Sequence, residues 1–124
     1  MFSSYAQKVR NFEDSPELEK VINSAVTKLE QREIQNGSTL FFYRGEISPF
    51  TGWRKQVRKT GDLRSLVEYK NGKPHGLNIY WWKNGKKAEK KNFHNGISHG
   101  LWESWYPSGR KQLEQSVENG KLHG

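Results

Sequence analysis

The stretch YKNGKPHG at residues 69–76 decides the fold, because it returns twice at an interval of 24 residues. It reads FHNGISHG at 93–100 and VENGKLHG at 117–124, and the phrases YWWKNG and SWYPSG alternate with it. All but one of the twelve glycines fall in the same 24-residue frame. Self-similarity at a fixed period of this length predicts a repeat protein.

The composition limits how large a core the chain can form. Its 124 residues are only 32% hydrophobic with a mean hydropathy of −1.01, which favours a thin or elongated structure. No apolar run approaches the ~20 residues of a membrane span, and residues 1–10 lack the apolar region of a secretory signal. We therefore expect a cytoplasmic protein. The absence of cysteine excludes disulfides and thiolate chemistry.

The net charge of +8 is unevenly distributed. Residues 1–43 hold five Lys/Arg and six Asp/Glu, so the repeats carry all of the positive excess. Such a field favours a polyanionic partner, which leaves nucleic acid, anionic lipid and an acidic protein open. The alternative is that the charges only keep the surface of the sheet solvated.

A short amphipathic helix is expected before the repeats. Ser15 suits an N-cap, Pro16 the first helical position and Glu17 an acidic first turn. Apolar residues follow at helical spacing, namely Leu18, Val21, Ile22, Ala25 and Val26. We expect the helix to end between Ala25 and Lys28 and to cap the first repeat, because repeat arrays need an atypical terminal unit.

Each repeat is predicted to form β-hairpins, because two runs rich in Trp, Tyr, Val and Leu are separated by turn signals such as KNG, PSG, KTG and QNG. Pro107 fits a type I turn, whereas Ser108 and Thr60 resist the positive φ of a type I′ turn. We therefore expect three-residue loops with glycine in the left-handed position, so that Trp82 and Lys86 face each other. Odd-numbered residues would then share one face of the sheet, and even-numbered residues the other.

The two predicted faces differ in chemistry. The odd face is mostly apolar and is predicted to be the core side: Trp53, Val57, Leu63, Val67, Tyr69, Leu77, Ile79, Trp81, Phe93, Leu101, Trp105, Leu113 and Val117. The even face joins positive charges to aromatic rings: Arg54, Arg58, Arg64, Lys86, Lys90 and Arg110, with Tyr80, Trp82, Trp102 and Tyr106. These aromatics either stiffen the sheet as cross-strand pairs, each worth ~0.2–1 kcal/mol, or form a binding surface.

The phrase NGKxHG followed by an aromatic pair and xNG, together with SPFTGW at residues 48–53, resembles the bacterial variant of the MORN repeat. The chain looks like a YwqK-type antitoxin. The resemblance covers residues 29–124, with a degenerate first hairpin, and leaves residues 1–28 as an N-terminal segment with the capping helix. It implies a mainly β fold, an elongated meandering antiparallel sheet of stacked hairpins. In named members it also implies neutralisation of a cognate toxin by binding.

The repeat frame also predicts the two ends of the array. Leu29 lies 24 residues before Trp53, so residues 29–34 are expected to form a strand. The last repeat stops at NGKLHG, a phrase that elsewhere leads into another strand. Either the chain belongs to a longer array, or the strand near residues 110–117 is an edge that can pair with another chain, including a second copy.

Catalytic and metal chemistry are not expected. His75, His99 and His123 recur at one repeat position, but equivalent residues of successive repeats lie about 9–10 Å apart at ~4.8 Å per strand, too far to share one zinc ion. We expect this histidine to hydrogen-bond its own turn. The acidic residues are scattered among lysines and no phosphate-binding glycine loop is present, so neither an enzymatic activity nor a cofactor is expected.

The sequence favours a protein-binding module of antitoxin or immunity type that occludes an acidic partner with the even face or with its open edge strand. Aromatic and Arg side chains are the usual anchors of interfaces. The predicted partner-binding residues are Arg54, Arg58, Tyr80, Trp82, Lys86, Lys90, Trp102 and Tyr106. Single-stranded nucleic acid stacked on the same face is the alternative. A third hypothesis is contact with anionic membranes through the basic cluster of Lys86, Lys87, Lys90 and Lys91.

Overall fold

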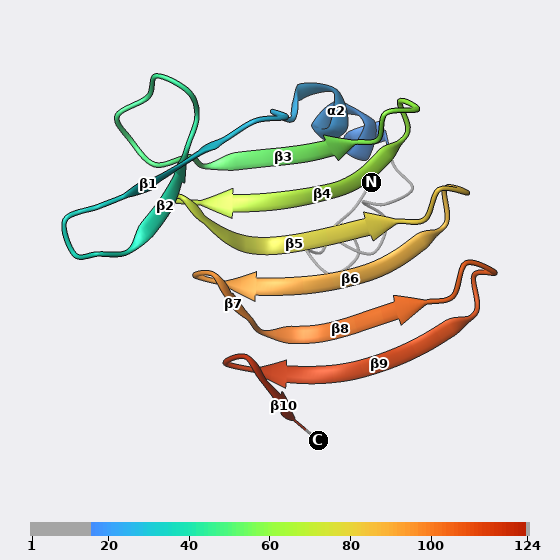
Figure 1. Ribbon diagram of the computed structural model, residues 1–124. Coiled ribbons are helices and arrows are strands. Elements are labelled where there is room, and N and C mark those ends of the chain that lie inside the picture. Colours follow the sequence, from blue (N-terminus) through green and yellow to red (C-terminus); the bar gives the residue numbers. More distant parts are fainter. Residues whose placement is uncertain (1–15, 124) are drawn as a thin grey trace.

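The main feature of the molecule is an open antiparallel sheet of eight strands (Figure 1). The computed structural model describes residues 16–123. The elements in chain order are α2 (Pro16–Ser24), β1 (Glu30–Glu33), β2 (Thr39–Phe42), β3 (Gly52–Val57), β4 (Leu63–Lys70), β5 (Lys73–Trp81), β6 (Lys87–His94), β7 (Ile97–Ser98), β8 (Gly100–Trp105), β9 (Lys111–Glu118) and β10 (Lys121–His123). The predicted fold class, a mainly β meandering antiparallel sheet of hairpins with one short N-terminal helix, is confirmed.

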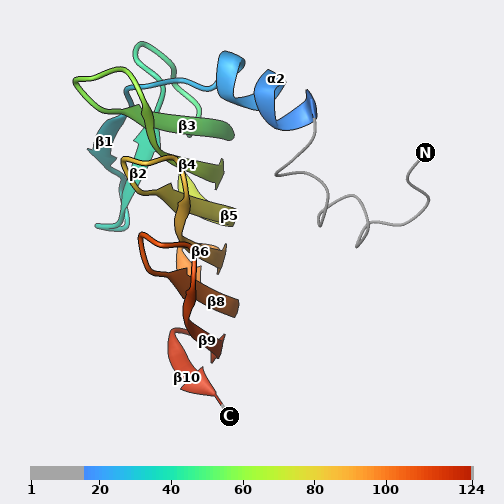
Figure 2. The ribbon, with the colours of Figure 1, turned by 90° about the vertical axis from the view of Figure 1, so that its right-hand side faces the viewer.

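The sheet is a row of consecutive hairpins. The strand order is β10-β9-β8-β6-β5-β4-β3, with the short β7 paired to β6. Figure 2 shows the strands edge-on in a single file. At one end β10 pairs with residues 116–118 of β9, so among the described residues no strand lies beside residues 111–115 on that edge.

The helix and the chain that follows it lie against β3 at the other end of the sheet (Figure 1). The helix ends at Ser24, one residue before the predicted interval, and its expected N-cap, Ser15, lies outside the described residues. Val26 then forms a parallel bridge with Arg54, and the Lys55 amide donates to the Val26 carbonyl at 2.8 Å. This segment therefore satisfies part of the free edge of β3.

The hairpin of β1 and β2 is a small sheet of its own, although β1 lies within the predicted strand at 29–34. It joins the large sheet through hydrogen bonds at one corner. The Phe41 amide donates to the Gly72 carbonyl, the Phe50 amide to the Phe41 carbonyl, and the Gly72 amide to the Phe50 carbonyl. The Phe41 and Phe50 rings also meet the Tyr69 ring edge-on, at 5.4 and 5.8 Å between centroids.

The predicted three-residue loops are present at the hairpin ends. The Trp82 amide donates to the Lys86 carbonyl at 2.8 Å, and the Gly85 amide to the Trp82 carbonyl at 2.9 Å. Gly85 has a φ of 86°, a left-handed conformation that glycine adopts without steric cost. The opposite ends of the strands turn through Asn–Gly pairs, in which Asn71 and Gly72 have φ values of 52° and 83°. Two consecutive positive values are the signature of a type I′ turn.

Beyond each three-residue loop a β-bulge changes the pairing of odd and even residues. Trp81 lies opposite Lys87, but Tyr80 lies opposite Glu89, with the irregularity between Tyr80 and Trp81. The same shift recurs in the β3–β4 and β8–β9 hairpins. An extra residue on one strand reverses which positions share a face from there on. The prediction that odd numbers share one face across both strands is therefore wrong for most of each hairpin.

Two adjacent rows of directly paired residues define the two faces, because residues opposite each other in an antiparallel pair share a face. The Tyr80 face holds the row Gln56, Ser65, Tyr80, Glu89, Ser104 and Leu113. The Ile79 face holds the row Lys55, Leu66, Ile79, Lys90, Glu103 and Glu114. Each row crosses all six long strands.

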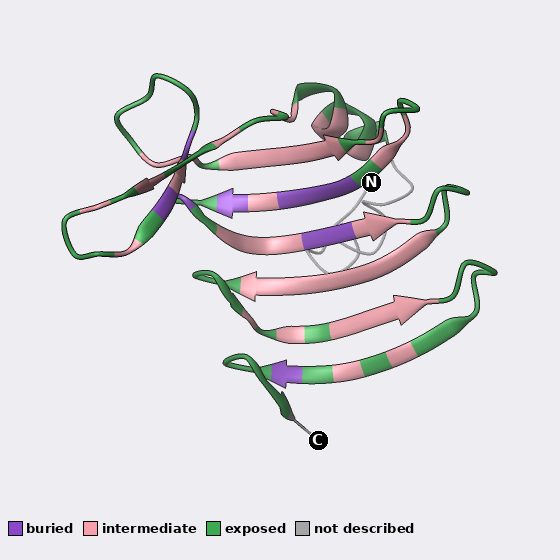
Figure 3. Ribbon diagram, viewed as in Figure 1, coloured by how far each residue is buried: buried purple, intermediate pink, exposed green. Residues whose placement is uncertain are grey.

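Burial is concentrated in the middle strands, β4 and β5, and on β2 (Figure 3). Leu66 and Ile79, on the Ile79 face, are both 0% exposed. On the other face Ser65, Val67 and Tyr69 are buried as well. The predicted odd-numbered core is therefore corrected: the core uses both faces of the central strands and includes the even-numbered Leu66. Away from these strands Val117 on β9 is buried, the other predicted core residues are half-buried, and Val57 and Leu101 are exposed.

Candidate protein-binding surface

An open groove of about 750 Å³ lies on the Tyr80 face over β5, β6, β8 and β9. Four of the predicted aromatic residues line it: Tyr80, Trp82, Trp102 and Tyr106. The others are Ala88, Glu89, Ser104, Trp105, Gln112 and Leu113. The 24-residue period brings these aromatics together, because Tyr106 follows Trp82 by one repeat and each hairpin is laid beside the next.

The floor of the groove is a contact between Trp102 and Glu89. The Trp102 indole Nε1 donates to Glu89 Oε2 at 3.0 Å, which satisfies the polar atom of the ring. Lys91 Nζ lies 5.0 Å from the centre of the Trp102 ring and 3.7 Å from Glu89 Oε1. A cation over an indole face is attracted by the ring quadrupole. Trp102 is thus held in place while its ring forms part of the groove surface.

Trp82 and Tyr106 are the more exposed aromatics of the groove, at 36% and 39%. The Trp82 indole Nε1 donates to the Trp105 carbonyl at 3.1 Å, so Trp82 links its hairpin to the next one. Arg58 makes the equivalent link one repeat earlier, from Nη2 to the Trp81 carbonyl at 2.6 Å. Tyr106 holds the same repeat position, and its ring lies 5.0 Å from the Arg110 guanidinium carbon. Tyr106 is therefore the most exposed aromatic of the groove, and within the described residues its side chain makes no hydrogen bond to another hairpin.

The predicted basic residues do not join the aromatics in one patch. Arg54 lies on β3 nearer to Gly52 than to the turn that follows Val57, and its Nη1 is 3.5 Å from Tyr69 Oη. Lys86 Nζ donates to the Ser108 carbonyl at 3.1 Å in the ladder of turns. Lys90 lies opposite Ile79 and Glu103, on the Ile79 face. The prediction that Lys90 shares one face with the aromatic residues is therefore wrong, because the bulge places Lys90 on the other side of the sheet.

Arg58 lies next to the groove, in a smaller hollow of about 460 Å³ that it shares with Trp82, Lys83, Asn84 and Pro107. The Asn84 amide nitrogen donates to the Pro107 carbonyl at 2.8 Å across this hollow. The β5–β6 and β8–β9 hairpins are thereby joined at their turns. Arg58 places a positive charge at the rim of the aromatic groove.

The Ile79 face carries an aromatic and charged cluster that was not predicted from the sequence. Lys87 Nζ and Lys111 Nζ lie 4.9 and 5.2 Å from the centre of the Trp105 ring. Lys111 also contacts Glu103 Oε2 at 2.6 Å and Glu114 Oε1 at 2.9 Å. These two hydrogen bonds, chiefly that of Glu103, raise the pKa of the Lys111 ammonium. The available signal was the spacing of Lys87 and Lys111, which differ by one repeat.

The histidines form a row at the Asn–Gly ends of the strands. The ring centroids of His75 and His94 are 4.9 Å apart, and those of His94 and His99 are 6.3 Å apart. His75 Nδ1 accepts a hydrogen bond from the Asn95 amide at 3.1 Å, in the turn of the next hairpin. The prediction that the histidine before glycine bonds its own turn is therefore wrong for His75. Within residues 16–123 no group of three potential metal ligands is found.

Comparison with known proteins adds no assignment. No protein-family model, curated protein or solved structure matches the chain. None of the helices within the described residues is long and apolar enough to cross a membrane.

Proposed function

We propose that this chain is a non-catalytic protein-binding module of the antitoxin or immunity type, which neutralises an acidic partner by occupying it with the Tyr80 face. The observation that carries the proposal is the open groove with Tyr80, Trp82, Trp102 and Tyr106 in its lining. Exposed Tyr and Trp anchors next to Arg are the side chains that contribute most to protein interfaces.

The charges around the groove suit an acidic protein surface. Arg58 and Arg110 lie at its rim, each beside an aromatic residue of the lining. Lys91 contributes a further positive charge over Trp102. Charged groups at a rim guide association and fix orientation, while the aromatic centre supplies most of the affinity.

A single-stranded nucleic acid is less well matched to this groove. Glu89 interrupts the positive charge of the lining beside the Trp102 ring, where a stacked strand would need cations along its phosphates. Of the predicted basic residues, Lys90 is on the opposite face and Lys86 is bound to a turn carbonyl. Aromatic stacking platforms for nucleic acid are normally combined with a continuous positive track.

The test is capture of a partner from nuclease-treated lysate of the protein's own source. The immobilised parent chain is compared with Tyr106→Ala and with Tyr43→Ala, a matched control at an exposed tyrosine, 47% accessible, outside the groove. We expect one acidic protein to be retained in stoichiometric amount by the parent and by Tyr43→Ala, and to be lost from Tyr106→Ala.

Equal retention by all three chains would exclude the groove as the binding surface. Retention of nucleic acid alone, seen only without nuclease and abolished by moderate salt, would replace the proposal by the nucleic-acid alternative.

A further inference from the structure

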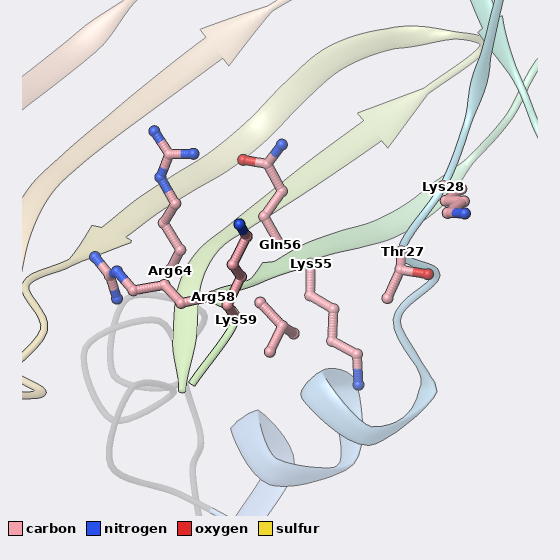
Figure 4. A pocket seen from close by; sticks show the side chains of 8 residues that line it. Thr27, Lys28, Lys55, Gln56, Arg58, Lys59 and Arg64 are labelled. Atoms are coloured by element: carbon pink, nitrogen blue, oxygen red, sulfur yellow. The ribbon is translucent and has the colours of Figure 1, made fainter. Parts of the chain in front are cut away.

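Another hollow, of about 580 Å³, lies at the other end of the sheet, between the β3–β4 hairpin and the segment that follows α2. Five cationic side chains line it, and no carboxylate does: Lys28, Lys55, Arg58, Lys59 and Arg64. Thr27, Gln56 and Val57 complete the lining. Figure 4 shows Arg64 and Gln56 pointing the same way, while Lys55 extends towards α2. We call these five residues the basic hollow.

Two of the five cations are anchored to the fold. Lys55 Nζ donates to the Ile22 carbonyl of the helix at 2.9 Å. Arg58 contacts Asp62 Oδ2 at 2.9 Å and the Leu63 carbonyl at 3.1 Å. Side chains held in this way keep their charge in place without having to be ordered by a ligand.

The other three cations, Lys28, Lys59 and Arg64, make no ion pair with any residue in the described range 16–123. Arg64 is the extra residue of the bulge in the β3–β4 hairpin. Bulges commonly redirect a side chain next to a functional site. The hollow thus combines cations that have no carboxylate partner in the described residues with a β-bulge that positions one of them, Arg64.

The charge is not a requirement of the hairpin. The repeat positions of Arg58 and Arg64 are occupied by Trp82 and Ala88 in the second hairpin. That hairpin has the same loop and the same bulge. Of the five cations only Arg58 has a carboxylate partner among the described residues, Asp62. The remaining positive charges destabilise the folded state by mutual repulsion, and a bound anion would relieve that repulsion.

We propose that the basic hollow binds a phosphate chain, the chemistry shared by inorganic polyphosphate and the tail of a nucleoside triphosphate. Phosphate oxygens accept several hydrogen bonds at once and match the planar donor fork of arginine. Gln56 and Thr27 add an amide and a hydroxyl donor to the lining. The volume of about 580 Å³ lies within the range of small-ligand sites.

The experiment is calorimetric titration of the full chain with tripolyphosphate at about 0.15 M salt, where long-range surface attraction is largely screened. Arg64→Ala should weaken binding by at least about tenfold, since a charge-assisted hydrogen bond is lost. Ala88 holds the equivalent position, so this variant should keep the fold, as circular dichroism will check. Arg110→Ala, which removes the same charge from the third hairpin, should change affinity by less than about twofold.

A second arm repeats the titration with ATP and with citrate. Binding of ATP that also depends on Arg64 assigns the nucleotide tail, and binding of tripolyphosphate alone assigns the inorganic chain; both support the proposal. The proposal is overturned if no phosphate chain binds, if citrate binds as tightly, or if Arg110→Ala weakens binding as much as Arg64→Ala. Because Arg64 is not in the aromatic groove, these outcomes are independent of partner capture.

Discussion

Along one row of the Ile79 face, the residues at the centre of the sheet differ in chemistry from those at its far end. Leu66, Lys90 and Glu114 hold the same repeat position on β4, β6 and β9, and Ile79 and Glu103 hold its partner position on β5 and β8. At the centre both residues are apolar and fully buried. At the far end both are carboxylates, and they are bridged by Lys111.

The backbone of the repeat and its side chains therefore have separate roles. The turns and their hydrogen bonds recur unchanged, as when the Gly72, Gly96 and Gly120 amides each donate at 2.8 Å to a carbonyl 22 residues earlier. The side chains at equivalent positions vary from apolar to charged. The centre of the sheet therefore supplies most of the stability, and the later hairpins are free to carry a binding surface.

The largest effect is expected from Leu66→Ala, because a fully buried leucine is removed from the packed centre. We expect the free energy of unfolding to fall by about 2–5 kcal/mol. Glu114→Ala, at the equivalent position, should lower it by less than about 1 kcal/mol, since exposed ion pairs contribute little. Urea denaturation of the two variants gives the comparison. Similar losses would show that stability is spread evenly along the sheet.

Equivalent glycines should also separate the centre from the end. Gly72 and Gly120 have φ values of 83° and 80°, so alanine costs ~1–2 kcal/mol at either site. At Gly72 the new methyl group would lie 2.8 Å from Leu40 Cβ, and overpacking adds ~1–3 kcal/mol there. At Gly120 its nearest neighbour is Ile97 Cγ2 at 3.5 Å. Thermal unfolding should give the larger drop in Tm for Gly72→Ala, and equal drops would refute the close packing at this corner.

At the proposed binding surface, substitutions should weaken partner binding more than they lower the stability of the fold. Trp102→Ala and Tyr106→Ala are each expected to weaken partner binding by ~2 kcal/mol or more, because aromatic anchors dominate interfaces. Tyr106→Ala should change the free energy of unfolding by less than ~1 kcal/mol, since its ring is partly exposed. Affinity and stability are measured on the same samples. A loss of binding that merely follows a loss of stability would argue against a role in recognition.

The smallest effect concerns the first turn, where Asp62 stands at the position of Lys86 and Arg110. The hydrogen bond from the Thr60 hydroxyl, and to a smaller extent the hydrogen bond from Arg58, lowers the pKa of Asp62 below its ordinary value. A depressed folded-state pKa stabilises the fold above the unfolded value, and this contribution is lost as the pH falls through the folded value. Asp62→Asn should therefore lose less Tm than the parent between pH 6 and pH 3. A loss equal to that of the parent would contradict this.

Much of the fold could be predicted from the positions of the glycines. The 24-residue period located the hairpins, and Pro107, Ser108 and Thr60 correctly indicated three-residue loops. The bulges could not be predicted, because the extra positions, Arg64 and Ala88, share no chemical feature. One unpredicted residue per hairpin was enough to mix the two faces.

The aromatic part of the site followed from the repeat, whereas the basic part did not. Tyr80 and Trp102 lie on β5 and β8, Trp82 and Tyr106 follow the last residues of these strands, and all four have even numbers, so they meet in one groove. The basic hollow depends on the bridge between Val26 and Arg54, which brings residues 27–28 beside the first hairpin. No periodic pattern links a segment before the repeats to a turn within them.

Photo-crosslinking with the captured partner tests whether the Tyr80 face is the partner-binding surface. Benzoylphenylalanine is introduced in place of Tyr106 in one sample and in place of Tyr43 in another. We predict a crosslinked heterodimer from position 106 and none from position 43. Crosslinking from position 43 alone would place the partner outside the groove and overturn the proposed function.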